Sequence, residues 1–151
     1  MKSRSAVMFA AAVLAVVGTA FVNAPAASAS ERFAAVTTEE FCAPGVTCGT
    51  AVTSLGPATV RTVITSFFPL PSGCFHDEHT TTLTYADDST LVLAIVGTLC
   101  PFPVVRFTGT YSVAGGTGQF IGATGSGFDR ATRPAVGPIR SQLVGDLALP
   151  N

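Results

Sequence analysis

Tryptophan is absent from this 151-residue sequence, tyrosine occurs twice, and charged residues make up only 11% of it. No lysine follows Lys2, so from residue 30 onward six arginines stand against nine carboxylates, a formal net charge of −3. A phosphate-binding surface needs clustered Lys and Arg, and this sequence has no such cluster. We therefore expect no nucleic-acid partner, and the acidic balance also argues against adhesion to anionic membranes.

Motifs for cofactor binding and for nucleophilic catalysis are missing as well. A dinucleotide fingerprint needs G-x-G-x-x-G between a strand and a helix. Residues 116–118 lead to Ile121 where the third glycine belongs, and residues 125–127 lead to Arg130. The sequence has no P-loop lysine, no G-x-S-x-G and no amphipathic helical run of useful length. We therefore predict that the protein uses no cofactor.

Residues 1–29 have the features of a secretory signal peptide. Lys2 and Arg4 precede an apolar run at 7–20, and small residues at 27–29 form a cleavage site. The apolar run is shorter than the roughly 20 residues that a membrane-spanning helix needs. We predict a secreted, extracellular protein with no stable membrane insertion after processing.

Four cysteines, Cys42, Cys48, Cys74 and Cys100, lie in the predicted exported part. An even number of cysteines in a small exported chain indicates disulfides, here two. Four cysteines allow three pairings. We favour Cys42 with Cys48, which would close a short turn, and Cys74 with Cys100, which would join two later segments. The absence of C-x-x-C argues against zinc, and we predict no metal.

Strand-like runs alternate with Gly, Pro and Asp turn signals along the rest of the chain. We predict about eight short strands in an all-β domain, an antiparallel barrel or sandwich at residues 48–151. Residues 30–47 are predicted as an N-terminal extension that carries the Cys42–Cys48 turn. The run at 91–96 is apolar on both faces, so its outer face should meet a second layer, a terminal segment or a neighbouring subunit. The clearest runs are 52–55, 60–68, 79–85, 91–99, 104–113 and 139–149.

A glycine-rich stretch at residues 109–129 carries tight-turn and bulge signals inside β-structure. A Tyr-x-Val strand is followed by Gly-Gly-Thr-Gly-Gln-Phe and then by Gly-Ala-Thr-Gly-Ser-Gly. This pattern resembles the allene oxide cyclase and dirigent barrel superfamily, in particular its small secreted bacterial members. The glycines that carry the resemblance are Gly115, Gly116, Gly118, Gly122, Gly125 and Gly127.

The resemblance implies an eight-stranded antiparallel β-barrel. Members of the superfamily bind a reactive, largely apolar intermediate in the barrel and steer its cyclisation or coupling, so any activity would be isomerase-like or cyclase-like. Relatives form trimers, which makes a homo-oligomer an expectation here. The glycine motif belongs to the fold, and no catalytic residue of the family maps onto a position of this chain.

His76, Asp77, Glu78 and His79 form the densest polar cluster. On a strand His76 and Glu78 share one face while Asp77 and His79 share the other, so the four converge only across a bulge. A solvated strand entry beside a disulfide accounts for the cluster without any function. The functional interpretations are a metal site on two of the four, or proton transfer by His76, Glu78 or His79 near the barrel mouth.

Arg61, Arg106 and Tyr85 are further ligand-binding candidates, on the hypothesis that they face the barrel interior. Each arginine interrupts an apolar strand. An inward arginine would need a carboxylate or a ligand oxygen, because an unpaired buried charge is costly. An outward arginine needs no explanation, and the sequence leaves both orientations open.

Two functions fit these patterns. The first is a secreted barrel that binds a small apolar molecule and guides its cyclisation or coupling. The alternative is a non-catalytic extracellular module that binds an envelope or a partner protein, or a secreted inhibitor that uses the loop at 68–71. A roomy pocket with convergent polar groups favours the first function, whereas a filled barrel with an exposed apolar patch favours the alternative.

Overall fold

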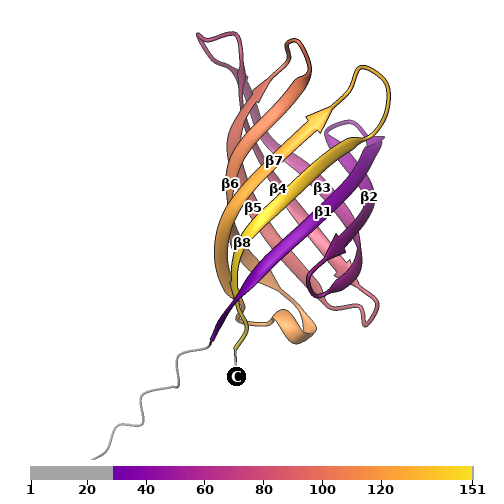
Figure 1. Ribbon diagram of the computed structural model, residues 1–151, viewed down its shortest axis with the longest axis vertical. Helices are drawn as coiled ribbons and strands as arrows, with labels where there is room; N and C mark the ends of the chain where they lie inside the picture. The colour runs from indigo at the N-terminus through magenta and orange to yellow at the C-terminus, as the bar shows by residue number, and fades with distance from the viewer. Residues whose placement is uncertain (1–28, 151) are drawn as a thin grey trace, which may run out of the picture.

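A computed structural model describes residues 29–150 and shows a closed barrel of eight antiparallel strands (Figure 1). Each strand pairs with the next along the chain, and β8 pairs with β1 to close the ring. Residues 1–28, most of the predicted signal peptide, lie outside the described part. The strands are β1 (Ser30–Ala43), β2 (Val46–Thr53), β3 (Gly56–Pro69), β4 (Phe75–Tyr85), β5 (Thr90–Cys100), β6 (Val105–Gly116), β7 (Thr124–Arg133) and β8 (Ile139–Ala148), with one 3-10 turn, η1 (Gly118–Phe120).

The predicted eight-stranded barrel and both predicted disulfide pairings are confirmed. The chain differs from the prediction at its start, because residues 30–43 form strand β1 and are not an extension outside the barrel. Alternate residues of β1 point inward, and two of the inward positions are Thr37 and Glu39. These buried polar residues interrupt the alternation of apolar and polar residues by which a strand is recognised in a sequence.

One end of the barrel is closed, and the glycine motif closes it. Phe120 of η1 is fully buried there, with its ring centroid 5.0 Å from that of Tyr85. Thr117 accepts a hydrogen bond from the backbone N–H of Thr90, and Gln119 donates one to the Ser89 hydroxyl, so η1 is fastened to the β4–β5 turn. Gly118 has φ of +58°, a left-handed conformation that favours glycine. The motif therefore forms a plug.

The half of the barrel next to this plug is filled with side chains. Inward apolar residues from every strand except β7 form one buried core, as expected for a small barrel whose interior is just wide enough for side chains. The outer face of β5 carries the exposed side chains of Ala94 and Val96, and no described segment covers them. A neighbouring subunit over this face stays a prediction. The buried core residues include Phe33, Val60, Leu83, Leu91, Leu93, Ile95, Tyr111, Leu143 and Leu147.

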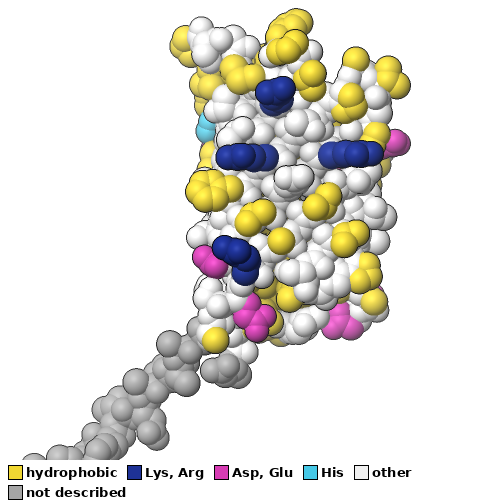
Figure 2. Space-filling view, viewed as in Figure 1, with side chains coloured by type: hydrophobic (Ala, Val, Ile, Leu, Met, Phe, Trp, Pro, Cys, Tyr) yellow, Lys and Arg dark blue, Asp and Glu magenta, His cyan; other side chains and the backbone are white. Residues whose placement is uncertain are grey.

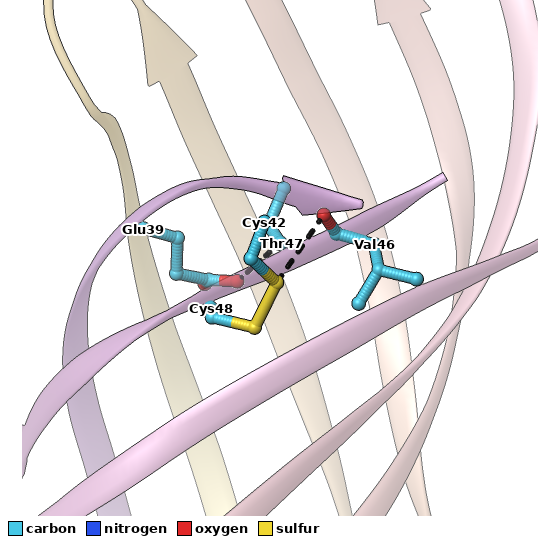
Figure 3. Close-up of a disulfide and its surroundings, with 5 residues drawn as sticks. All are labelled: Glu39, Cys42, Val46, Thr47 and Cys48. Carbon is cyan, nitrogen blue, oxygen red and sulfur yellow. Dashed lines mark hydrogen bonds between the residues drawn. A yellow bond between two sulfur atoms is a disulfide. The ribbon is translucent and has the colours of Figure 1, made fainter. Parts of the chain in front are cut away.

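The opposite end carries both disulfides. Cys42–Cys48 spans the β1–β2 hairpin, and Cys74–Cys100 joins the start of β4 to the end of β5. Figure 3 shows the first disulfide, with the Sγ of Cys42 3.7 Å from the carbonyl oxygen of Val46. The β3–β4, β5–β6 and β7–β8 loops lie at this same end (Figure 1), which we call the mouth. The disulfides therefore tie the strand ends that form the mouth.

Candidate functional site

A cavity of about 140 Å³ occupies the mouth half of the barrel. Exposed Phe41 and Arg133 lie at its outer end, where the guanidinium of Arg133 is 5.1 Å from the ring centroid of Phe41. A void of roughly 150 Å³ is large enough to take benzene. The cavity therefore has room for one small ring. Its apolar wall is formed by Phe41, Ile64, Leu99, Val105, Phe107, Ala131, Ile139 and Leu143.

Two glycines allow the ring of Phe107 to lie against the barrel wall. Gly97 on β5 and Gly109 on β6 are cross-strand partners. A Cβ built on either glycine would stand 2.6 Å from the Cζ atom of Phe107, so any larger residue at these positions would collide with the ring. The ring occupies the place of two missing side chains, and the space in front of it stays part of the cavity.

Four polar side chains from β4, β7 and β8 line one side of the cavity. His79 Nδ1 lies 2.9 Å from Asp77 Oδ1, and His79 Nε2 lies 3.8 Å from Asp129 Oδ2. The hydroxyl of Ser141 donates a hydrogen bond to Asp129 Oδ1. Both aspartates are almost fully buried. The side chains form a chain of contacts, Asp77–His79–Asp129–Ser141, in which one imidazole stands between two carboxylates.

The two carboxylates keep His79 protonated at neutral pH. Burial alone would lower the pKa of His79, but the carboxylates of Asp129 and Asp77 outweigh burial and raise the pKa to about 9. The 3.8 Å separation from Asp129 is longer than a hydrogen bond. The Nε2 atom makes no hydrogen bond within residues 29–150 at this separation, and His79 lines the cavity.

A third carboxylate, that of Glu39 on β1, lines the same cavity. The hydroxyls of Thr37 and Thr47 each donate a 2.6 Å hydrogen bond to it, one to each carboxylate oxygen. Figure 3 shows the Glu39–Thr47 contact beside the Cys42–Cys48 disulfide. Charge-assisted hydrogen bonds of this length stabilise a buried carboxylate. The polar side of the cavity thus offers several acceptor oxygens and one cationic donor.

The structure separates the histidine cluster, as alternation along a strand requires. Asp77 and His79 point into the barrel, whereas His76 and Glu78 pair with each other on the outside at 2.9 Å. The ring of His76 stacks on Phe68, with centroids 4.6 Å apart. Of the candidates His76, Glu78 and His79, only His79 lines the cavity.

The other three candidates do not reach the cavity. Arg61 and Arg106 are exposed on the outer surface, because the inward positions of β3 and β6 are taken by their neighbours Val60 and Phe107. Tyr85 faces inward as hypothesised, but at the closed end, where its hydroxyl lies 3.3 Å from that of Thr53. The hypothesis of an inward arginine is therefore not met.

Sequence reasoning missed Asp129, Glu39 and Ser141. Asp129 follows directly on the glycine-rich motif and sits inside β7 with its side chain inward. Its neighbour Phe128 points outward and is exposed, so the usual order of apolar inside and polar outside is reversed at this position. The available signal was the two-residue spacing of Gly127, Asp129 and Ala131, which share the inner face.

No group of three or more His, Cys, Asp or Glu residues with an arrangement suited to a metal ion occurs within residues 29–150. The same part of the chain contains no helix long and apolar enough to cross a membrane.

Comparison with known proteins gives few matches. No protein-family model matches the chain, and no curated protein matches it. Among solved structures, the chain is similar to that of the pterocarpan synthase dirigent protein GePTS1. The two share 15% sequence identity over 93% of this chain and 100% of that chain, with a TM-score of 0.44.

Proposed function

We propose that the protein is a secreted, small-molecule-binding barrel whose ligand enters the mouth and presents a polar group to His79. The observation that carries this proposal is the cavity itself, which combines an apolar wall with the Asp77–His79–Asp129 contact chain. Binding sites for small molecules usually pair apolar walls with a few well-placed polar groups. The two disulfides suit an oxidising, extracellular setting.

The ligand class follows from the size and chemistry of the cavity. A volume of about 140 Å³ fits one small ring, so a larger molecule would leave its remaining atoms in the mouth beside Phe41 and Ile139. The imidazolium of His79 donates to a carbonyl or ether oxygen, and the carboxylates accept from a hydroxyl. We propose a mostly apolar, single-ring or ring-bearing molecule with an oxygen function at the end that enters first.

Ring closure or coupling is the activity that this site would support best, in agreement with the resemblance in the glycine motif. Confinement in an apolar pocket supplies proximity and orientation. A protonated His79 would stabilise negative charge that develops on the ligand oxygen, or transfer its proton to that oxygen. Asp77 and Asp129 would hold the ring in position, and their charges would favour its reprotonation by a proton taken up from water.

Ligand-detected NMR with three single-ring probes tests the site. Toluene reports on the apolar wall, benzaldehyde adds an acceptor oxygen, and phenol adds a hydroxyl donor. His79→Gln removes the charged donor, and loss of a hydrogen bond to a charged group corresponds to about tenfold weaker binding or more. We expect this loss for benzaldehyde and little change for toluene.

His76→Gln is the matched control, since His76 lies on the same strand and pairs with a carboxylate at the same 2.9 Å distance, but on the outside. It should bind all three probes like the wild type. Failure of the wild type to bind any of the probes, or equal losses in His79→Gln and His76→Gln, would contradict the proposal.

A further inference from the structure

The mouth of the barrel carries exposed apolar side chains on separate loops. Phe102 in the β5–β6 loop is 88% exposed and Val136 in the β7–β8 loop is 90% exposed. Phe67 and Phe68, at the end of β3, are about half exposed. Phe102 and Val136 are the two most exposed large apolar side chains within residues 29–150. Figure 2 shows hydrophobic side chains at the outermost points of this end, and others spread over the barrel wall.

Exposed arginines lie just below these loops on the outer face of β6, β7 and β8. Arg106 and Arg140 both pair with Thr132, one from each side, and Arg130 lies two residues before Thr132 on β7, farther from the mouth. At an interstrand spacing of about 4.8 Å, Arg106 and Arg140 are roughly 10 Å apart along one row. Figure 2 shows dark-blue side chains close beneath the apolar end. No arginine within residues 29–150 forms a salt bridge.

Charge is distributed unevenly between the two ends of the barrel. The exposed carboxylates near the mouth are Glu40 and Glu78, and Glu78 is paired with His76. Four exposed carboxylates, against the single arginine Arg32, lie at the closed end: Glu31, Asp87, Asp88 and Asp146. The exposed surface of the mouth end is therefore richer in arginine than in carboxylate, and the other three carboxylates of this half, Glu39, Asp77 and Asp129, are buried inside the barrel.

We propose that the mouth end docks on an anionic lipid surface, with the tips Phe102 and Val136 entering the interface and Arg106, Arg130 and Arg140 on the lipid phosphates. The apolar side chains stand on separate loops around the cavity opening. Such an arrangement suits insertion into a fluid bilayer interface, whereas a protein partner would be bound by a continuous flat patch. Aromatic and aliphatic tips bind by burying apolar area, and arginine adds attraction to anionic headgroups. The Cys74–Cys100 disulfide holds the end of β5 that leads into the Phe102 loop.

This docking would give the cavity a direct route to apolar molecules. The cavity opens at the same end that carries the apolar tips, beside Phe41 and Arg133. A poorly water-soluble ligand could then pass from the lipid phase into the barrel without crossing bulk water. The docking surface lies outside the cavity, so the two proposals can fail independently.

Cosedimentation with lipid vesicles of the chain that begins at residue 30 tests the docking. The lipids are phosphatidylcholine alone and phosphatidylcholine with a minority of phosphatidylglycerol. We expect binding to the anionic vesicles, weakened when ionic strength rises from about 0.1 M to about 1 M, where screening shortens to about 3 Å. The double variant Phe102→Ser/Val136→Ser should bind about tenfold more weakly or worse. Arg106→Gln and Arg140→Gln should each lower affinity about fivefold.

Matched controls come from the closed end of the barrel. Ile121→Ser removes an apolar side chain that is 66% exposed there, and Arg32→Gln removes an exposed arginine. Both should bind vesicles like the wild type, as should His79→Gln. The proposal is overturned if the wild type does not bind anionic vesicles, if the tip variant binds as well as the wild type, or if Ile121→Ser loses as much binding as the tip variant.

Discussion

The Nδ1 atom of His79 lies 2.9 Å from a carboxylate oxygen of Asp77 inside the cavity, two residues away on the same strand. A second pair, His76 and Glu78, repeats the 2.9 Å distance one residue out of phase on the outer surface. The chain therefore contains two histidine–carboxylate pairs on one strand, one buried inside the barrel and one partly exposed on its outer surface. The buried pair can be probed with the outer pair as its control.

Stability should depend on pH through His79. Burial opposes its charge, but Asp129 and Asp77 raise its pKa from 6.5 to about 9. The folded protein therefore holds this proton more tightly than the unfolded chain does. The resulting stabilisation, roughly 3 kcal/mol, is fully present below pH 6.5 and lost as pH rises to 9. Urea denaturation across this pH range should show the decline in the free energy of unfolding. The His79→Gln variant should show a smaller decline. An unchanged slope in that variant would contradict the assignment.

Removing the charge of Asp77 should change the titration of the inner histidine alone. Asp77→Asn deletes one of the two carboxylates beside His79, so the pKa of His79 should fall by about one unit or more. With only two histidines in the sequence, the ring-proton NMR signals can be followed separately. Glu78→Gln, the control on the outer face, should leave the pKa of His79 where it was. A change in the pKa of His79 in both variants would mean that the two histidine–carboxylate pairs are not separated by the barrel wall.

Tyr111→Phe should leave the protein as stable as the wild type or more stable. The hydroxyl of Tyr111 is buried and has no hydrogen-bond partner within residues 29–150. Burial and the charge of Asp146 raise the pKa of Tyr111 to about 12. Removing a buried, unpartnered hydroxyl recovers its desolvation cost, about 1 kcal/mol. Thermal and chemical denaturation measure the change, and a loss of stability of that size would show that the hydroxyl has a partner after all.

Gly97→Ala should destabilise the barrel by about 1–3 kcal/mol, the usual cost of overpacking. The new methyl group would overlap the carbonyl oxygen of Thr108 and stand 2.6 Å from the ring of Phe107, so both the strand and the ring must move. Gly115→Ala is the control, because nothing lies within 4 Å of the corresponding position. Urea denaturation compares the two variants, and equal stability would contradict the packing of Phe107 against the Gly97–Gly109 pair.

Most of the fold was predictable because its signals are local. Turn residues, β-branched runs and the glycine motif each depend on a few neighbouring positions, and the cysteine spacing favoured the pairing that the structure has. Strand β1 escaped this reasoning because its inward face carries Thr37 and Glu39, which look like exposed residues in a sequence.

The site was only partly predictable because it is assembled from strands far apart in the chain. Alternation separated His79 from His76 and grouped His79 with Asp77. It could not reveal that Asp129, fifty positions later, faces the same imidazole from β7. That contact depends on the register of the closed barrel, which no local pattern encodes. The orientation of Arg61 was open for a similar reason, since the apolar residues around it occupy both faces of β3.

Native mass spectrometry of the purified protein, prepared without detergent, tests the central claim most directly. We predict that the wild type retains a small molecule or takes up a single-ring probe at one copy per chain. Ala131→Phe, which fills the cavity from β7, should abolish this binding, and Arg61→Ala on the outer surface should not. A wild-type protein that stays empty with every probe, or an Ala131→Phe variant that binds as the wild type does, would contradict a ligand site inside the barrel.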